Sequence, residues 1–283
     1  MGYPLEGIQA QITSVTALTD LSTMLDPSTG AIGANSVTIN VSAPQLNTTA
    51  QGNTSLARKP GLKTWSATVQ ALYTRATKYL GNKSNVSLSS GTLYWVKGYQ
   101  LSIATAGVLD ISNTTQADDD WAYFMPSRLV GATGTIDCLS ESSAGPIEPL
   151  DPDGAAPTAT FAFRDESTDP SISCAVNLSV LDVGMPIGEP QNQTTRYSFE
   201  STGNLTAVSG TSSPCIFPAG TIDGPDWDTD SSGSPDVSIV FTAASGRTYT
   251  GTCFWRQVDI SMVQDQLAAV TVQLQGAGPL AIA

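Results

Sequence analysis

Three aspartates at alternate positions, Asp226, Asp228 and Asp230, form the stretch best suited to chemistry. Oxygen ligands at alternate positions are how a tight loop wraps Ca²⁺. However, Ser231 stands where the helix-loop-helix calcium pattern has Gly, and Val237 stands where it has a bidentate Glu. We therefore favour a solvated acidic loop, and we keep a Ca²⁺ site made by these aspartates as the alternative.

Catalysis is the function class that the composition weakens most. The sequence contains no His, which removes Ser-His and Cys-His couples and His-rich metal sites. No pair of carboxylates stands out, and the acidic run 118–120 is expected to be a solvated loop. We expect no enzymatic activity and no cofactor beyond the Ca²⁺ considered above.

The cysteines and tryptophans are expected to serve packing. Four cysteines in a chain of 283 residues are too few for a disulfide scaffold, and none lies in a C-x-x-C pair. We expect small buried hydrophobes, with Cys174 and Cys253 at equivalent places of a repeat described below and no bridge between them. The tryptophans in or beside strand patterns are expected to anchor the core or a subunit interface: Trp65, Trp95, Trp121 and Trp255.

Nine of the ten asparagines open an Asn-x-Ser/Thr triplet: Asn40, Asn47, Asn53, Asn82, Asn85, Asn113, Asn177, Asn192 and Asn204. This triplet accepts N-glycans on surface loops of secreted proteins. We prefer the explanation that Asn, Ser and Thr are favoured together in turns and strand ends, and glycosylation stays open as the alternative.

The composition limits which fold classes and which partners can be expected. The chain is long enough for two domains of about 100–150 residues. Only 13% of its residues are charged, and Gly and Pro are abundant at 25 and 17, which favours strands and turns. The net charge of −13 repels nucleic-acid phosphate and anionic lipid. Residues 1–7 lack the pattern of a signal peptide, and no apolar run approaches the ~20 residues of a membrane span, so we expect synthesis in the cytosol and no membrane binding.

A block of three predicted strands occurs twice in the C-terminal part. Its copies, which we call the B blocks, span residues 158–163, 172–178 and 195–205, and then 236–243, 248–255 and 269–280. Each third strand closes on an apolar residue, then Gly four positions later and Leu two after that: Phe199, Gly203, Leu205 and Leu274, Gly278, Leu280. Self-similarity in a fixed order indicates an internal duplication.

The N-terminal part also contains two matching blocks, which we call the A blocks. The first has strand patterns at 37–42 and 65–73 around the polar segment 44–59, and the second has them at 99–103, 108–112, 121–126 and 131–139 around the polar segment 113–120. The order is therefore A, A, B, B, with A blocks in residues 1–140, a Pro-rich linker at 141–157 and B blocks in residues 158–283. Pairing each A block with one B block would make two modules, and tandem, nested and strand-exchanged pairings all remain open.

These patterns predict an all-β fold. We expect two β-sandwich or β-barrel modules from the duplication, with at most short helices, and residues 74–80 could supply a short helix or a turn.

The A blocks resemble the major tail (tube) proteins of long-tailed, non-contractile viruses. The likeness is carried by Tyr-x-Leu-Ser-Ile at 99–103, Leu-Asp-Ile-Ser at 109–112, Leu-x-x-Trp-Ser-Ala-Thr-Val at 62–69 and Thr-Gly-Thr-Ile at 133–136, and the strands at 197–203 and 272–278 are similar to the family's closing strands. The likeness covers most of residues 36–280. The chain departs from the family in containing two copies of the set.

The resemblance implies a structural protein of the virion tail, assembled in the host cytoplasm. Three chains with two modules each would imitate the family's six-fold ring, and stacked rings would form the conduit for genome delivery. The implied partners are other copies of the chain, tape-measure proteins, tail-tip or terminator proteins, and viral DNA that passes through the lumen without specific binding. A lumen lined by acidic and small polar groups would repel the phosphates, and the polar segments 44–59 and 113–120 would make inter-ring or inter-subunit contacts.

Two alternatives remain. A distal tail or tail-terminator ring would share the fold and would not stack indefinitely. A cell- or virion-surface β-sandwich glycoprotein or adhesin would use the Asn-x-Ser/Thr triplets and the acidic loop as its functional features.

Overall fold

The computed structural model describes residues 11–16, 32–49, 55–56, 58–73, 85–89, 93, 95–112, 120–139, 156–163, 170–184, 194–208, 216–217, 219–222, 224, 237–243, 246–264 and 266–283. These residues are all-β and include no helix, which confirms the predicted fold class. Accordingly, no helix in this part of the chain is long and apolar enough to span a membrane. Residues 74–80, expected to form a helix or turn, lie outside the described residues.

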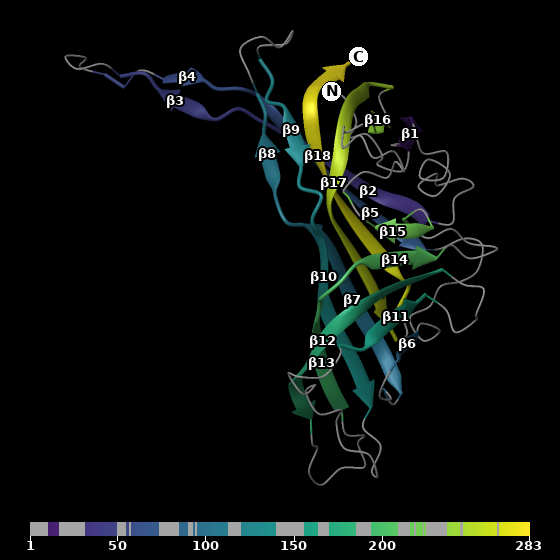
Figure 1. Cartoon of the computed structure of the whole chain (residues 1–283). Helices are drawn as coiled ribbons and strands as arrows, with labels where there is room; N and C mark the ends of the chain where they lie inside the picture. Colours follow the sequence, from purple (N-terminus) through teal and green to yellow (C-terminus); the bar gives the residue numbers. More distant parts are fainter. Residues whose placement is uncertain are drawn as a thin grey trace.

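One long antiparallel sheet organises the chain (Figure 1). The main path runs through eight long strands in the order β12, β13, β10, β7, β17, β18, β5, β2. Their bounds are β2 Ile32–Ser42, β5 Thr64–Tyr73, β7 Val96–Thr105, β10 Val130–Leu139, β12 Ser171–Gly184, β13 Thr194–Ser201, β17 Thr248–Val263 and β18 Ala269–Ile282. Apolar and polar residues alternate along them, and successive side chains of a strand point to opposite faces, so each strand presents one apolar and one polar face.

The path consists of two four-strand sets with the same internal order. Set 1 is β12, β13, β10 and β7, and set 2 is β17, β18, β5 and β2. In each set two strands of a B block lie beside two strands of an A block. The second A block lies beside the first B block, and the first A block lies beside the second B block, which is a nested order. The pairing of β7 with β17 joins the two sets.

The pairing registers align the two sets residue by residue. Ile136 of β10 lies opposite Tyr197 of β13 in set 1, and Val69 of β5 lies opposite Val272 of β18 in set 2. When Ile136 is matched to Val69, the closing pattern of β13 falls on that of β18, as in the sequence comparison. Cys253 lies opposite Gly276, so its counterpart in set 1 is Val176, which lies opposite Ser201. Cys174 and Cys253 are therefore not at equivalent positions as predicted, because the counterpart of Cys253 lies two residues after Cys174.

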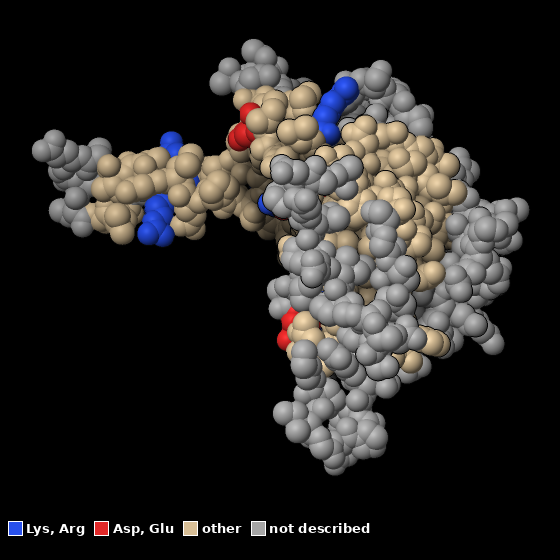
Figure 2. All heavy atoms as spheres, turned by 60° about the horizontal axis from the view of Figure 1, so that its bottom comes forward, with Lys and Arg blue, Asp and Glu red and all other residues tan. Residues whose placement is uncertain are grey.

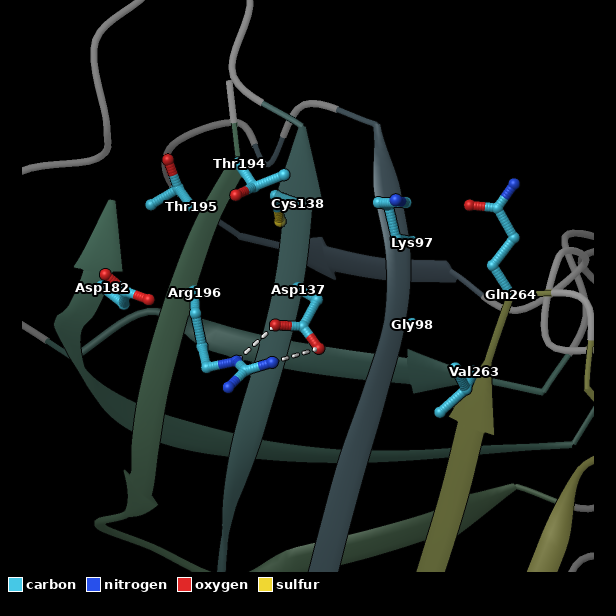
Figure 3. A pocket seen from close by; sticks show the side chains of 10 residues that line it. All are labelled: Lys97, Gly98, Asp137, Cys138, Asp182, Thr194, Thr195, Arg196, Val263 and Gln264. Atoms are coloured by element: carbon cyan, nitrogen blue, oxygen red, sulfur yellow. Dashed lines mark hydrogen bonds and ion pairs between the residues drawn. The ribbon is translucent and has the colours of Figure 1, made fainter. Parts of the chain in front are cut away.

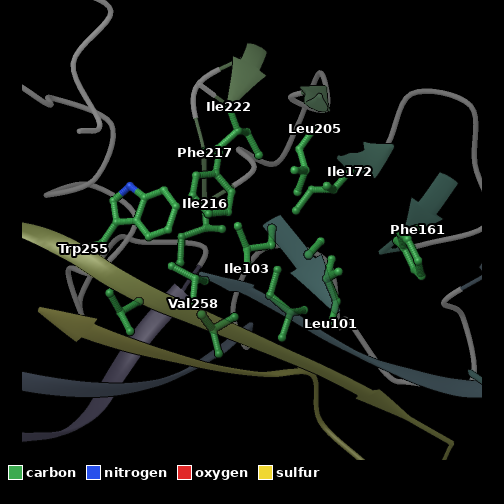
Figure 4. Close-up of a cluster of buried hydrophobic side chains, with 14 of the residues drawn as sticks. Leu101, Ile103, Phe161, Ile172, Leu205, Ile216, Phe217, Ile222, Trp255 and Val258 are labelled. Carbon is green, nitrogen blue, oxygen red and sulfur yellow. The ribbon is translucent and has the colours of Figure 1, made fainter. Parts of the chain in front are cut away.

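A smaller layer of strands lies over set 1. It comprises β6 (Asn85–Leu88), β11 (Thr158–Ala162), β14 (Leu205–Val208) and β15 (Gly220–Ile222), arranged around the first residues of β12. The ring of Phe161 lies 5.3 Å from that of Tyr99 and 4.8 Å from that of Phe199. Phe217 belongs to the same apolar cluster (Figure 4), and its ring centroid lies 5.3 Å from that of Trp255. In set 1 the core thus lies between this layer and the apolar face of the main sheet, and the buried cluster continues into set 2 and β16.

In set 2 the strand corresponding to β11 is β16 (Val237–Thr242), since each forms a hairpin with the first long strand of its B block. β16 also pairs with β1 (Gln11–Thr16).

Trp65 fixes β5 against the end of β18. Its side chain is buried, and the indole Nε1 donates a hydrogen bond of 3.0 Å to the carbonyl oxygen of Gly278. A Cβ at Gly276 would collide with the indole, and a Cβ at Gly251 would lie 2.6 Å from its Cζ2 atom. Glycine at these positions provides the space that the indole occupies.

Two short hairpins, which we call arm 1 and arm 2, project from the sheet (Figure 1). Arm 1 pairs β3 (Gln45–Asn47) with β4 (Arg58–Pro60), and arm 2 pairs β8 (Val108–Asp110) with β9 (Phe124–Pro126). A parallel bridge between Lys63 and Trp121 links their bases. The sequence predicted the strands of arm 2, whereas those of arm 1 fall within and beside a segment expected to be irregular.

Candidate functional site: a polar sheet face, two open edges and two arms

The aspartates of the candidate Ca²⁺ loop, Asp226, Asp228 and Asp230, lie outside the described residues. Within the ranges that the structure describes, no three Cys, Asp or Glu side chains form a group that could hold a metal ion. Asp120, the last residue of the acidic run, is exposed and pairs with Nζ of Lys63 at 3.1 Å. Three other features of the sheet are candidates for function.

The first feature is a continuous polar face on the main sheet. Directly paired residues of neighbouring antiparallel strands lie on the same face, so the registers identify its members. The paired polar residues on this face are Thr38 and Asn40 (β2), Ser66, Thr68 and Gln70 (β5), Thr271, Gln273 and Gln275 (β18), Gln257, Asp259 and Ser261 (β17), Gln100 and Ser102 (β7), Thr133, Thr135 and Asp137 (β10), Arg196, Ser198 and Glu200 (β13), and Asn177, Ser179 and Asp182 (β12). Hydroxyls and amides dominate this face across both sets.

The charged residues paired in these registers are few and mostly acidic: Asp137, Asp182, Glu200 and Asp259, with Arg196 as the basic member. Lys97 and Arg256 are exposed at the register shifts of β7 and β17. Arg196 Nε donates to Oδ1 of Asp137 at 2.6 Å, and Nη2 donates to Oδ2 at 3.4 Å (Figure 3). These hydrogen bonds, the charge of Asp137 and that of Asp182 raise the pKa of Arg196. The guanidinium is thus held by its own carboxylate partner, beside a cavity of about 380 Å³ at one end of the face.

A hydrogen-bonded cluster marks the joint between the two sets. Nε2 of Gln257 donates to Oγ of Ser102 at 3.1 Å and to the carboxylate oxygens of Asp259 at 2.8 and 3.1 Å. Because Ser102 and Asp259 also lie opposite each other on β7 and β17, the cluster connects the polar faces of the two sets.

The second feature is a pair of open edges. β2 ends the strand path, and among the described strands only β5 pairs with it. β12 pairs with β11 through residues 171–175, whereas from Asn177 to Gly184 the described strands pair with it only on the β13 side. Rows of unpaired backbone donors and acceptors on an edge are templates for pairing with another strand.

The third feature is the surface of the arms. Arm 1 exposes Leu46 and Leu56, which are 54% and 69% exposed, beside the basic residues Arg58 and Lys59. No Asp or Glu occurs in residues 44–59 of this acidic chain. Figure 2 shows the basic side chains on the projecting arm, while most described residues elsewhere in that view are uncharged. Arm 2 exposes the apolar residues Leu109, Ile111 and Met125.

The four tryptophans predicted to be anchors differ in how deeply they are buried. Trp65 and Trp255 are buried and Trp121 is half-buried, as expected of anchors, whereas Trp95 is 72% exposed and does not belong to the core.

The asparagines of the Asn-x-Ser/Thr triplets that the structure describes lie in different kinds of segment. Asn40 and Asn177 lie within long strands, and Asn47 lies on arm 1. Asn85 lies in the short strand β6, and Asn204 lies between β13 and β14. Asn53, Asn82, Asn113 and Asn192 lie outside the described residues.

Some strands were not predicted from the sequence, although one of them has an alternating pattern that indicates it. Residues 256–263 extend β17, and Val258, Ile260 and Met262 alternate there with polar residues. That alternation is typical of a strand buried on one face. Arm 1 offered no such signal, because β3 and β4 are exposed at every position.

The sequence matches no protein-family profile, and no curated protein matches it at a significant level. Function is therefore inferred from the geometry of the sheet itself.

Proposed function

We propose that the chain is a structural subunit of a viral tail tube, in which three copies close a ring and stacked rings form the conduit for genome delivery. The observation that carries the proposal is the strand order, because two equivalent four-strand sets end on one open edge each. A head-to-tail contact between unlike edges closes into a ring when the rotation per subunit permits it. Three chains then contribute six similar sets around one axis.

The polar face supports the role of a conduit. In a closed ring the apolar face stays buried in the core of each copy, and the polar face lines the channel. Its hydroxyls and amides are uncharged, and the guanidinium of Arg196 is paired with Asp137. The remaining carboxylates repel phosphate, so DNA would pass without the phosphate contacts that make protein–DNA complexes stable.

The arms support contacts between rings. Arm 1 is basic and partly apolar, whereas the chain as a whole has a net charge of −13. A projecting basic arm is electrostatically complementary to the acidic surface of another copy. Tape-measure, tail-tip or terminator proteins would be the further partners of such a tube, and assembly would take place in the host cytoplasm.

Purified full-length chain, analysed by sedimentation and negative-stain microscopy, tests the proposal. We expect trimeric rings or stacked tubes with an open axis. Rings that never stack would favour a distal tail or terminator ring of the same fold. Monomers at high protein concentration, with no open axis, would contradict the proposal. An intact mass above that of the bare 29.4 kDa chain would instead support the glycoprotein alternative.

A further inference from the structure

The joint between the two sets shows how an A strand and a B strand of this protein pair. β7 runs antiparallel to the second half of β17, with Leu101 opposite Ile260 and Ser102 opposite Asp259. β16 pairs with the first half of β17. Because β18 occupies the other edge of β17 along both halves, β7 and β16 lie end to end along the same edge.

The open edges are the counterparts of this joint. Matching the registers of the two sets places β2 on β7, with Asn40 at the position of Ser102. The same matching places β12 on β17, with Asp182 at the position of Asp259. β11 occupies the edge of the first half of β12, as β16 does in β17. The strand that would continue this edge along the second half of β12 is missing from the described chain.

Burial at the β2 edge also differs from that at the joint. Ile103 of β7 is fully buried, whereas its counterpart Val41 is 51% exposed. Val41 lines an apolar cavity of about 290 Å³ with Ile39, Phe241 and Tyr249. Exposed apolar residues beside an unpaired strand edge are typical of a surface that a partner covers.

We propose that β2 of one copy pairs antiparallel with residues 179–184 of β12 in a second copy, in the register of the β7–β17 joint. The predicted opposite residues are Thr38 with Gly184, Ile39 with Val183, Asn40 with Asp182, Val41 with Val180, and Ser42 with Ser179. This inference rests on the proposed ring and deepens it by naming the two strands and their register.

The side chains at the centre of this pairing are complementary. Asn40 has an amide that can donate to the carboxylate of Asp182, which takes the place that Asp259 has opposite Ser102 at the internal joint. Both members lie on the polar face, so the pairing continues that face from one copy to the next. The repetition of Asp at the two equivalent positions is expected if both positions serve the same kind of joint.

Disulfide cross-linking of the full chain tests the register. Opposite residues of antiparallel strands have Cα atoms about 4.5–5.5 Å apart, which is within the range of a disulfide. In a Cys215→Ser background, we expect N40C/D182C to form covalent dimers and a covalent trimer as the largest species on oxidation. The matched control is N40C/N177C. Asn177 is exposed on the same strand as Asp182 but lies several residues out of register with Asn40, so this variant should form little cross-link.

The outcomes separate the register from the ring. Trimeric rings without a cross-link in N40C/D182C, or with an equal cross-link in N40C/N177C, would overturn the register and leave the proposed ring intact. Cross-linking specific to N40C/D182C that continues into open ladders would support the strand pairing and contradict a ring of three. A protein that is monomeric and forms no cross-link would contradict both.

Discussion

Trp65 connects strands of set 2 that are distant in the sequence. The Trp65 indole fills space left by glycines on two other strands and hydrogen-bonds to the backbone at the end of β18. It therefore connects the first A block to the second B block, which lies about two hundred residues later in the chain. A residue in this position reports on the nested order, because a tandem pairing would not bring Trp65 to β18.

Replacing Trp65 by Ala should destabilise the protein severely. Truncation of a buried Trp removes its packing, leaves a cavity and typically costs about 3–5 kcal/mol. Chemical denaturation would measure the free energy of unfolding. The matched control is Trp95→Ala, because Trp95 is largely exposed, and a surface change is expected to stay within about 0.5 kcal/mol. Equal losses in the two variants would contradict this packing.

The buried cysteines make stability dependent on pH at the alkaline end. Burial raises the pKa of the Cys253 thiol from 9.0 to about 12 and that of Cys174 to about 11. Above pH 9 the unfolded chain releases these protons while the folded chain retains them, so the free energy of unfolding should fall as the pH rises through this window.

Comparison with Cys253→Ala checks this prediction. The variant should lose stability less steeply between pH 8.5 and pH 10 in denaturation experiments, because it has one fewer thiol to release. Tyrosine titration is common to both proteins and cancels in the comparison. Identical slopes would show that the Cys253 thiol does not contribute.

At the scale of elements, the sequence predicted most long strands and left their pairing undecided. Alternation marks β5 and β10 clearly, since Trp65, Ala67 and Val69 point to one face and Ala132 and Ile136 do the same. The partner of a strand is set by contacts distant in the chain, such as Val69 opposite Val272, and no local pattern encodes these contacts. The short strands of arm 1 were unpredictable for another reason, because exposure at every position leaves no period to detect.

The B strands of the two sets bulge at different places, since β12 contains a register shift between Val180 and Asp182. β17 contains register shifts between Gly251 and Cys253 and between Trp255 and Gln257. A bulge inserts a residue in one strand and shifts the pairing that follows. Spacing in the sequence could not reveal it.

The polar face should exclude DNA because its paired positions carry more carboxylates than cations. We expect the wild-type assembly not to retard linear double-stranded DNA in gel-shift experiments at moderate salt. The variant Thr68→Lys/Gln273→Lys introduces two positive charges on neighbouring strands and should bind DNA with an affinity that falls steeply with salt. Thr68→Glu/Gln273→Glu is the matched control for size and polarity. Retardation by the wild-type protein would contradict a repelling face.

Arm 1 should control stacking separately from ring closure. Arg58→Glu/Lys59→Glu reverses the charge of an exposed hairpin and should abolish tubes while leaving trimeric rings in sedimentation and microscopy. The charge-preserving swap Arg58→Lys/Lys59→Arg should still form tubes. Loss of the rings themselves in the reversed variant would show that arm 1 belongs to the subunit interface.

For the whole molecule, an internal duplication would explain why one chain has two unlike edges. If the sets were separate chains, every edge of one kind would meet an edge of the other kind. Joining them covalently fills one such contact with the β7–β17 pairing and leaves one β2 edge and one β12 edge per chain. A ring of such chains contains no free edge, which protects it from uncontrolled aggregation.

A cryo-electron microscopy reconstruction of the assembled full-length chain would show directly whether the open edges close a ring. We expect a three-fold ring with six similar four-strand sets, in which Thr68 of set 2 and its counterpart Thr135 of set 1 alternate around one open channel. A reconstruction with the polar face turned outward, or with β2 and β12 unpaired at the subunit boundary, would contradict it.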